Sequence, residues 1–388
     1  MKQLKAIMLA TCLVSPMTLP VTGQEYADRL EPKWRALDRN ADGRVSLEEL
    51  HPLQRRVMAA HDKDADGEIS LDEYAAYDLD PGNAAAIPIP DTVRLLQDLP
   101  YAGTGDPRQR LDIMLPANRD SDDPLPVVAY VHGGGWAMGS KVSARTQMLP
   151  LVASGRYAVV SIGYRLSWQD HWPAQLHDVK AGIRWIRAHA ADHGLDSDRI
   201  CALGPSAGGH LVAMLGTTNG DSSLEGQLGK HRDRSSDVQC VVDFFGPADL
   251  RDAKAVDPLG NPSMESQLLG GAPAENPEKA AEASPVVHVD EGDVPFLIIH
   301  GTRDSLVPYS QSVALAGALR EAGVSVTLQT IEGGGHGDFA GAMPEVNARL
   351  GAFLRQQLYG AAIEVPADPL KPGQPSPDGL PHAGEGAR

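Results

Sequence analysis

The chain has 388 residues, of which 42% are hydrophobic and 22% are charged, and its formal net charge is −17. This composition is that of a soluble globular protein and excludes a chain that is disordered along its whole length. The negative charge argues against a nucleic-acid or anionic-membrane partner, because phosphate groups are bound by clustered Lys and Arg. The length allows one large domain with accessories or two medium ones.

Residues 1–23 have the pattern of a secretory signal peptide. Lys2 and Lys5 precede an apolar run over residues 6–14, and small residues follow it. The run is too short to form a membrane-spanning helix, and no later stretch is long enough for one. We therefore expect a secreted or periplasmic protein. A lipoprotein signal ending at Cys12 is the weaker alternative, because the residue before this cysteine fits that pattern poorly.

Two acidic twelve-residue segments, 38–49 and 62–73, match the calcium-binding loop of an EF-hand. Such a loop supplies oxygen ligands from positions 1, 3, 5, 7, 9 and 12 and has glycine at position 6. Both segments meet all of these requirements, which a solvated acidic surface would hardly do twice by chance. The expected ligands are Asp38, Asn40, Asp42, the Arg44 carbonyl, Ser46 and Glu49 in the first loop, and Asp62, Asp64, Asp66, the Glu68 carbonyl, Ser70 and Glu73 in the second.

The sequence therefore predicts a small all-α EF-hand pair over residues 24–80 that holds two structural Ca²⁺ ions. Val45 and Ile69 occupy position 8 of the two loops, where paired loops join through a short β-bridge. This module resembles the EF-hand pairs of exported bacterial proteins. Residues 81–90, rich in Pro and Ala, are predicted to form a linker.

Residues 91–360 alternate short apolar runs with amphipathic segments such as 175–191, where apolar residues recur at spacings of three and four. Strands that alternate with helices predict an α/β domain, with a mostly parallel sheet covered by helices on both faces. The last segment, 361–388, is rich in Pro and Gly and is expected to be a disordered tail. The predicted strands cover residues 126–131, 157–163, 199–203, 238–245, 294–300 and 324–331.

A Gly-x-Ser-x-Gly motif from Gly204 to Gly208 lies between a predicted strand and a predicted helix. A sharp strand-to-helix turn needs small residues on both sides of a projecting side chain, so Ser206 is the predicted nucleophile. The motif alone is a weak signal. Its position in a strand–turn–helix pattern strengthens it.

A second glycine-rich segment directly follows the predicted strand 126–131. Glycine lets the backbone turn its N–H groups toward a substrate, as an oxyanion hole requires. A Gly run is more often only a tight turn, but its position at the end of this strand favours the oxyanion hole. The predicted donors are the N–H groups of Gly134, Gly135 and Ala207.

A serine nucleophile needs a base within hydrogen-bond reach and an acid that orients the base. Asp304 and His336 follow the last two predicted strands, on the side where open parallel sheets bind ligands, and they are the predicted acid and base. Asp249 is the alternative acid. His132 is expected to fix the glycine loop, and His300 is placed inside a strand.

Six segments of the sequence, taken in chain order, resemble the α/β-hydrolase esterases of the bifunctional feruloyl and acetyl-xylan esterase type. These enzymes are relatives of the hormone-sensitive-lipase-like carboxylesterases. The resemblance covers residues 111–359 and implies an α/β-hydrolase fold with eight strands and a Ser-His-Asp acyl-enzyme mechanism that needs no catalytic cofactor. One departure is Pro205 before the nucleophile, which leaves the predicted roles intact. The segments that carry the resemblance are VHGGGW, GYRL, PAQLHDVKAGIRWIRAH, DRICALGPSAGGHL, HGTRDSLVP and GGGHG.

The favoured interpretation is an exported serine carboxylesterase acting on short-chain acyl or aryl esters, including acetyl or feruloyl groups on plant polysaccharides. A calcium-dependent binding module on an inactive hydrolase scaffold is disfavoured, because nucleophile, base and oxyanion loop are all present. A serine peptidase on the same fold stays open, because a fold does not fix the substrate. The lack of repeated β-blades before the domain counts against it.

Three cysteines occur in the chain, and the first lies in the predicted signal peptide. Cys201 and Cys240 lie in predicted strands, where free thiols behave as small buried hydrophobic groups. An exported protein can form a disulfide bond, but the sequence indicates no disulfide framework.

Overall fold

The computed structural model describes residues 42, 44–47, 49, 62–70, 73, 89–119, 121–257, 260–339 and 341–371. The chain divides into two units, residues 1–77 and 78–388. The predicted signal peptide, most of the predicted linker and the predicted ligands Asp38 and Asn40 lie outside the described residues.

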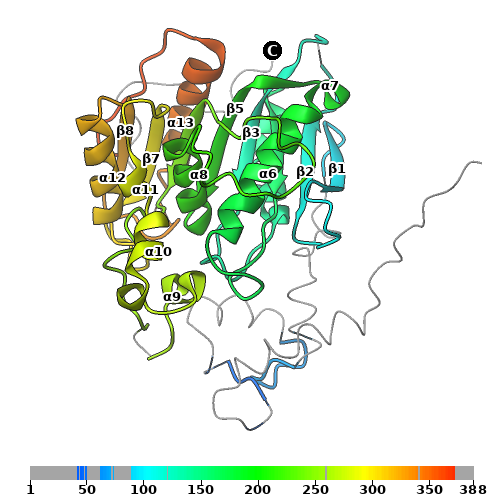
Figure 1. Cartoon of the computed structure of the whole chain (residues 1–388). Helices are drawn as coiled ribbons and strands as arrows, with labels where there is room; N and C mark the ends of the chain where they lie inside the picture. Colours follow the sequence, from blue (N-terminus) through cyan, green and yellow to red (C-terminus); the bar gives the residue numbers. More distant parts are fainter. Residues whose placement is uncertain are drawn as a thin grey trace, which may run out of the picture. The chain divides into compact units, whose positions relative to one another are not determined.

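The larger unit is built on one eight-stranded sheet with the strand order β1-β2-β4-β3-β5-β6-β7-β8 (Figure 1). β2 runs antiparallel to both β1 and β4, and all other neighbouring strands are parallel. The mostly parallel sheet predicted from the alternating pattern is thus confirmed. The strands are β1 (Val93–Pro100), β2 (Arg110–Pro116), β3 (Leu125–Val131), β4 (Ala158–Ile162), β5 (Leu195–Pro205), β6 (Cys240–Phe244), β7 (Phe296–Gly301) and β8 (Val326–Ile331).

All six strands predicted from apolar runs are present, and the two additional strands are the antiparallel ones, β1 and β2. Exposed polar residues interrupt the apolar pattern of β1. β2 is almost entirely buried, but it contains Asp112, which lies 2.5 Å from Lys141 Nζ and 2.9 Å from an Arg145 nitrogen. Ion pairs allow this charged residue to be buried. Because of it, β2 is not a continuous apolar run in the sequence.

Helices cover both faces of the sheet, and Figure 1 shows α6, α8 and α12 in front of it and α13 behind it. The predicted helix 175–191 corresponds to α6, which ends before His189. No helix among the described residues is long and apolar enough to cross a membrane. The helices are η1 (Lys141–Ser143), α4 (Ala144–Gln147), α5 (Leu149–Ala153), α6 (Ala174–Ala188), α7 (Ala190–His193), α8 (Ala207–Thr217), α9 (Met264–Leu269), η2 (Pro273–Glu275), α10 (Pro277–Glu282), α11 (Pro285–His288), α12 (Ser310–Glu321) and α13 (Met343–Tyr359).

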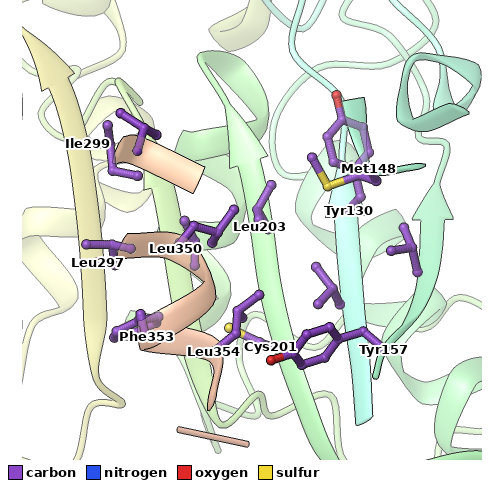
Figure 2. Packing of buried hydrophobic residues seen from close by; sticks show 14 of the residues in the cluster. Tyr130, Met148, Tyr157, Cys201, Leu203, Leu297, Ile299, Leu350, Phe353 and Leu354 are labelled. Atoms are coloured by element: carbon purple, nitrogen blue, oxygen red, sulfur yellow. The ribbon is translucent and has the colours of Figure 1, made fainter. Parts of the chain in front are cut away.

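The core on one face of the sheet forms between the strands and α13. Leu350 and Leu354 of α13 are buried in the same cluster as Leu203 of β5 and Leu297 of β7 (Figure 2). Burial of each such side chain stabilises the fold by about 1.5–3 kcal/mol. This packing fixes the sheet whose carboxyl edge carries the candidate site.

Cys201 in β5 and Cys240 in β6 are opposite each other in adjacent parallel strands, with their Cα atoms 4.7 Å apart, and they form a disulfide bond. The sequence left open whether these two cysteines stay reduced, and the structure pairs them. The apolar runs around the cysteines indicated their burial. They did not indicate that β5 and β6 would be neighbours in this register.

The beginning of the tail is also part of the fold. Leu370 is 4% exposed and bridges to Ile331 at the edge of β8. The buried Arg349 donates hydrogen bonds to the Asp368 side chain at 3.1 Å and 3.2 Å. The expectation of a disordered tail does not hold for residues 361–371, because one apolar side chain and one buried arginine anchor a segment that is otherwise rich in Pro.

Candidate active site and acidic loops

Ser206 stands on a sharp turn between β5 and α8, with φ 55° and ψ −122°. A side chain other than glycine rarely takes a positive φ, so the backbone here is strained. A Cβ on Gly204 would lie 2.5 Å from the Gly208 backbone, and a Cβ on Gly208 would collide with the Val131 carbonyl. The two glycines of the motif are therefore required by the close approach of β3 to this turn.

The structure brings together the three residues that the sequence predicts as a triad. His336 Nε2 lies 3.0 Å from Ser206 Oγ, and His336 Nδ1 lies 2.7 Å from Asp304 Oδ2. The acid and the base follow β7 and β8, at the carboxyl edge of the sheet. The geometry is that of a nucleophile, a base that can take its proton, and an acid that orients the base.

The carboxylate of Asp304 is fully buried and accepts four hydrogen bonds. Leu306 N–H and Val307 N–H donate to Oδ1 at 2.8 Å and 2.9 Å. His336 and His300 both donate to Oδ2, His300 at 3.1 Å. Burial alone would raise the pKa of Asp304, but the hydrogen bonds from His300 and His336 hold it well below its usual range. Asp304 is therefore ionised and oriented before any substrate binds.

His300 is a member of this arrangement that the sequence analysis missed. Its ring is fully buried, and its Nε2 faces two acceptors, Asp304 Oδ2 and the Val307 carbonyl at 3.0 Å. Nε2 must therefore carry a proton. Nδ1 lies 2.7 Å from Ser312 Oγ. The signal was present, because a histidine at a strand end, four residues before the predicted acid, can reach that acid.

The glycine loop after β3 lies directly against the nucleophile. A Cβ on Gly133 would be only 3.5 Å from Ser206 Cβ. Gly134 and Gly135 have φ values of +120° and +57°, which favour glycine. Among the described residues, no acceptor is bonded to the N–H groups of Gly134, Gly135 or Ala207. These three N–H groups are therefore free to donate to a ligand.

His132 supports this loop from below, as the sequence analysis expected. Its ring stacks on Tyr164 with the centroids 4.2 Å apart, and Nδ1 lies 2.9 Å from the Gly133 carbonyl oxygen. Tyr164 O–H donates to the His132 carbonyl at 2.9 Å. Burial lowers the pKa of His132 to about 3, so the ring is neutral and acts through packing and hydrogen bonding.

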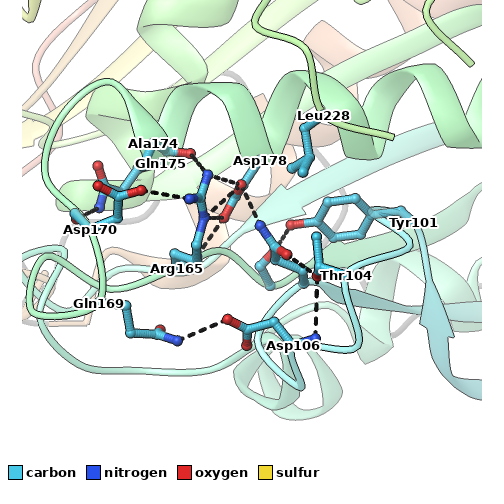
Figure 3. Close-up of polar contacts among 12 residues, drawn as sticks. Tyr101, Thr104, Asp106, Arg165, Gln169, Asp170, Ala174, Gln175, Asp178 and Leu228 are labelled. Atoms are coloured by element: carbon cyan, nitrogen blue, oxygen red, sulfur yellow. Dashed lines mark hydrogen bonds and ion pairs between the residues drawn. The ribbon is translucent and has the colours of Figure 1, made fainter. Parts of the chain in front are cut away.

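Arg165, in the GYRL segment, anchors a second loop beside the glycine loop (Figure 3). Its guanidinium group binds the fully buried Asp178 of α6 at 2.7 Å and Asp170 at 2.7 Å. Trp168, between these contacts, donates its indole N–H to the Ala137 carbonyl at 3.1 Å. The ion pairs thus fix a segment that contacts the glycine loop.

The alternative acid, Asp249, has a different role. Its carboxylate forms an ion pair with Arg251 at 2.6 Å and is not bonded to His336. The structure therefore favours Asp304 as the partner of the histidine.

The described parts of the two acidic loops are joined by the β-bridge that the sequence predicts. The bridge pairs Ser46 with Glu68, and Ile69 N–H donates to the Val45 carbonyl at 2.7 Å. Val45 and Ile69 are both fully buried. The two loops thus form one unit.

The two loops also share the same geometry at positions 9 and 12. Ser46 donates from its N–H and its hydroxyl group to Glu49 Oε2, at 2.7 Å and 2.9 Å. Ser70 does the same to Glu73 Oε2, at 2.9 Å and 2.8 Å. These hydrogen bonds fix the side chain of the glutamate at position 12 of each loop.

The donor set of the second loop suits a calcium ion. Carboxylate oxygens of Asp62, Asp64 and Asp66 all lie within 4.8 Å of one another. Three carboxylates at such distances repel one another, and hard oxygen ligands of this kind are those that Ca²⁺ prefers. These residues and Glu73 would hold the ion. In the first loop, Asp42 and Glu49 are the predicted acidic ligands that lie among the described residues.

The serine on a strand–turn–helix elbow, followed by its acid and histidine after later strands of a mostly parallel sheet, defines an α/β-hydrolase fold. The chain belongs to the BD-FAE family, whose model matches residues 111–319, more than half of the 388 residues. An EF hand model matches residues 35–58.

Relatives of this chain are esterases. Esterase LipQ of Mycobacterium tuberculosis is 32% identical over 228 residues, which are 59% of this chain and 53% of LipQ, so the chain spans about half of that relative. A truncated form of a carbohydrate esterase from gut microbiota is 33% identical with a TM-score of 0.63, covering 70% of this chain and 99% of that chain. The bifunctional GH43-CE of Bacteroides eggerthii is 34% identical with a TM-score of 0.61, covering 68% of this chain and 38% of that chain.

Proposed function

We propose that the protein is a serine carboxylesterase that works through an acyl-enzyme on Ser206. The observation that carries this proposal is the placement of His336 between Ser206 Oγ at 3.0 Å and Asp304 Oδ2 at 2.7 Å. The names of the related proteins support ester hydrolysis.

In the proposed mechanism, Ser206 Oγ attacks the carbonyl carbon of the ester while His336 Nε2 takes its proton. The N–H groups of Gly134, Gly135 and Ala207 stabilise the oxyanion that forms. His336 then gives the proton to the departing alcohol oxygen, which leaves an acyl group on the serine. Water, deprotonated by His336, attacks this acyl group, and the carboxylic acid and the free serine are released.

For the substrate, we propose short acyl or aryl groups carried by carbohydrates, including acetyl or feruloyl groups on plant polysaccharides. Two structural relatives are described as a carbohydrate esterase and a bifunctional GH43-CE, and this supports an acylated carbohydrate as the alcohol side. The resemblance of the sequence motifs to feruloyl and acetyl-xylan esterases supports an acetyl or feruloyl group as the acyl part of the substrate.

We further propose that both acidic loops bind Ca²⁺ and that the protein is exported to the periplasm or secreted. Bound Ca²⁺ neutralises the clustered carboxylates and supplies no step of the ester chemistry. Export is supported by the signal-like residues 1–23 and by the Cys201–Cys240 disulfide, because disulfides persist in oxidising compartments.

Labelling of the full chain with an organophosphate tests the nucleophile. We expect a single labelled peptide, the one that contains Ser206, and no label on Ser206→Ala. This variant should also lose several orders of magnitude in turnover of a small acyl ester. The matched control, Ser223→Ala on the surface, should behave as the wild type. Labelling at another serine, or full turnover by Ser206→Ala, would reject the assignment.

A panel of acetylated xylan, a feruloylated sugar, a simple short-chain ester and a peptide substrate tests the substrate class. We expect hydrolysis of the esters and none of the peptide. Cleavage of the peptide alone would replace the proposed esterase with a peptidase.

A further inference from the structure

A pocket of about 720 Å³ lies on the sheet face that α13 covers. Its walls come from α5, the start of β4, the ends of β5 and β6, and α13. Figure 2 shows four of the lining residues on the elements around it, Met148, Tyr157, Leu203 and Leu350. The pocket has the volume of a small-molecule site. Neither Ser206 nor His336 lines it, but their chain neighbours Pro205 and Gly337 do, so the pocket borders the candidate active site.

The charged residues in the pocket wall are all positive. Arg156 and Arg355 line the pocket and no Asp or Glu does, although the chain as a whole has a net charge of −17. Within the part of the chain that the structure describes, neither of these guanidinium groups has an ion-pair partner. Two unpaired arginines in an acidic protein favour an anionic ligand.

The two arginines lie near the same buried phenol. Tyr157 is 2% exposed, and its hydroxyl group has no hydrogen-bond partner among the described residues. Burial raises the pKa of Tyr157 to about 12, and the nearby charges of Arg355 and Arg156 oppose this rise. The part of the pocket near Tyr157 therefore carries two charged donors, Arg156 and Arg355.

The rest of the wall is apolar. Leu203, Leu350, Phe244 and Phe339 line it together with Met148. The pocket thus combines a positive end with a long apolar wall. Its complement is a molecule with a negative head and an apolar body.

We propose that this pocket binds a carboxylate with an apolar tail, with the carboxylate on Arg156 and Arg355 and the tail against Leu203, Leu350 and the phenylalanines. A guanidinium group matches a carboxylate in geometry and charge. Fatty acids and aryl-substituted acids released by ester hydrolysis share this chemistry. Binding here does not depend on the proposed esterase activity.

The pocket shares wall residues with the surroundings of His336. Phe245 lines the pocket, and its ring centroid lies 4.5 Å from that of His336. Gly337, the residue after His336, lines the pocket as well. A ligand in the pocket therefore contacts the segment that carries the base.

Calorimetric titration of the full-length Ser206→Ala variant tests the proposal, with decanoate, decanol and cinnamate as probes. We expect one carboxylate to bind per chain and decanol to bind at least tenfold more weakly than decanoate. Tighter binding of decanoate assigns the pocket to fatty acids, and tighter binding of cinnamate assigns it to aryl acids. Failure of both acids to bind, or equal binding of decanol and decanoate, overturns the proposal.

Variants locate the site. Arg156→Ala combined with Arg355→Ala should weaken carboxylate binding at least tenfold, while the corresponding pair of Lys substitutions should retain most of it. Arg232→Ala, on the surface elsewhere, is the matched control and should change nothing. Binding that is unaffected by loss of both arginines overturns the proposal.

Two further measurements separate the pocket from the active site. Ala348→Trp, which fills the pocket from α13, should abolish binding in a variant that melts like the wild type. Wild-type protein that an organophosphate has inactivated should still bind the carboxylate. Loss of binding after inactivation would place the ligand in the catalytic site and overturn the proposal.

Discussion

The candidate active site and the acidic loops both concentrate negative charge, and they compensate for it in opposite ways. The Asp304 carboxylate is buried among four donors that the protein itself supplies. In the second loop, carboxylate oxygens of Asp62, Asp64 and Asp66 gather within 4.8 Å of one another. The first arrangement is complete without a ligand, whereas we propose that a cation completes the second.

This difference predicts that changes in the two regions affect different properties, activity in the first and stability in the second. A site whose charges are compensated by fixed hydrogen bonds loses activity when one donor is removed, because its geometry is pre-organised for the reaction. A loop whose charges need an ion loses stability when that ion is removed. The following changes test this division, from the largest expected effect to the smallest.

Asp304→Asn should lower kcat for a small ester by about 10⁴-fold, because the amide no longer stabilises the protonated His336 and favours the wrong tautomer. Steady-state kinetics measure the effect, and the melting temperature reports whether the variant folds. Asp249→Asn is the matched control and should keep its activity. An equal loss in the two variants would contradict the assignment of the acid.

Gly134→Val should lower kcat by about 10² to 10³-fold, the usual cost of losing one oxyanion donor. The new side chain collides with the Met138 carbonyl at a φ of +120°, so the loop must move. Gly317→Ala, at a helical position with open space around it, is the control. Wild-type turnover by Gly134→Val would show that the loop does not line the oxyanion hole.

His300→Phe should lower kcat about tenfold to a hundredfold and leave KM nearly unchanged, because one donor to the Asp304 carboxylate is lost. Loss of that hydrogen bond raises the pKa of Asp304. The carboxylate must be ionised for activity, so the loss of turnover that accompanies protonation of Asp304 should begin at a higher pH in the variant than in the wild type.

His300→Gln provides the matched rescue, because its amide places an N–H donor near the position of the ring Nε2. This variant should recover part of kcat and of the pH profile. If the Phe and Gln variants share the same kcat and pH profile and differ from the wild type only in melting temperature, His300 serves packing alone.

Removal of calcium should change stability and leave the chemistry nearly intact. An ion that binds only the folded loops stabilises them by RT ln(1 + [L]/Kd), about 2.7 kcal/mol at a hundredfold excess over Kd. Chelation should therefore lower the melting temperature of the EF-hand unit, measured by calorimetry. Turnover of a small ester at low temperature should change little.

Glu73→Gln should make the melting temperature less sensitive to added calcium, because it removes a ligand charge from one loop. An immediate and calcium-reversible loss of turnover in a chelated protein that stays folded would assign the ion to the mechanism instead.

The sequence predicts the parts of this structure that local patterns determine. The parallel strands are continuous apolar runs, and Ser206, Asp304 and His336 follow such runs directly. The spacing of four residues between His300 and Asp304 was a local signal that could have been used. The Cys201–Cys240 bond depends on which strand registers meet in space, and no local pattern encodes that. Asp112 of β2 is compensated by Lys141 and Arg145, which are distant in sequence, so the strand was missed for the same reason.

The disulfide has a consequence for what happens when the chain is cut. It joins residues separated by 39 positions, and Ser206 and α8 lie inside the closed ring. By chain entropy, closing such a ring stabilises the fold by about 4 kcal/mol. A protease that nicks the partly exposed stretch 219–237 leaves both fragments covalently linked through the sheet. The nick becomes visible on a gel only after reduction, and until then Ser206 stays tethered to Asp304 and His336.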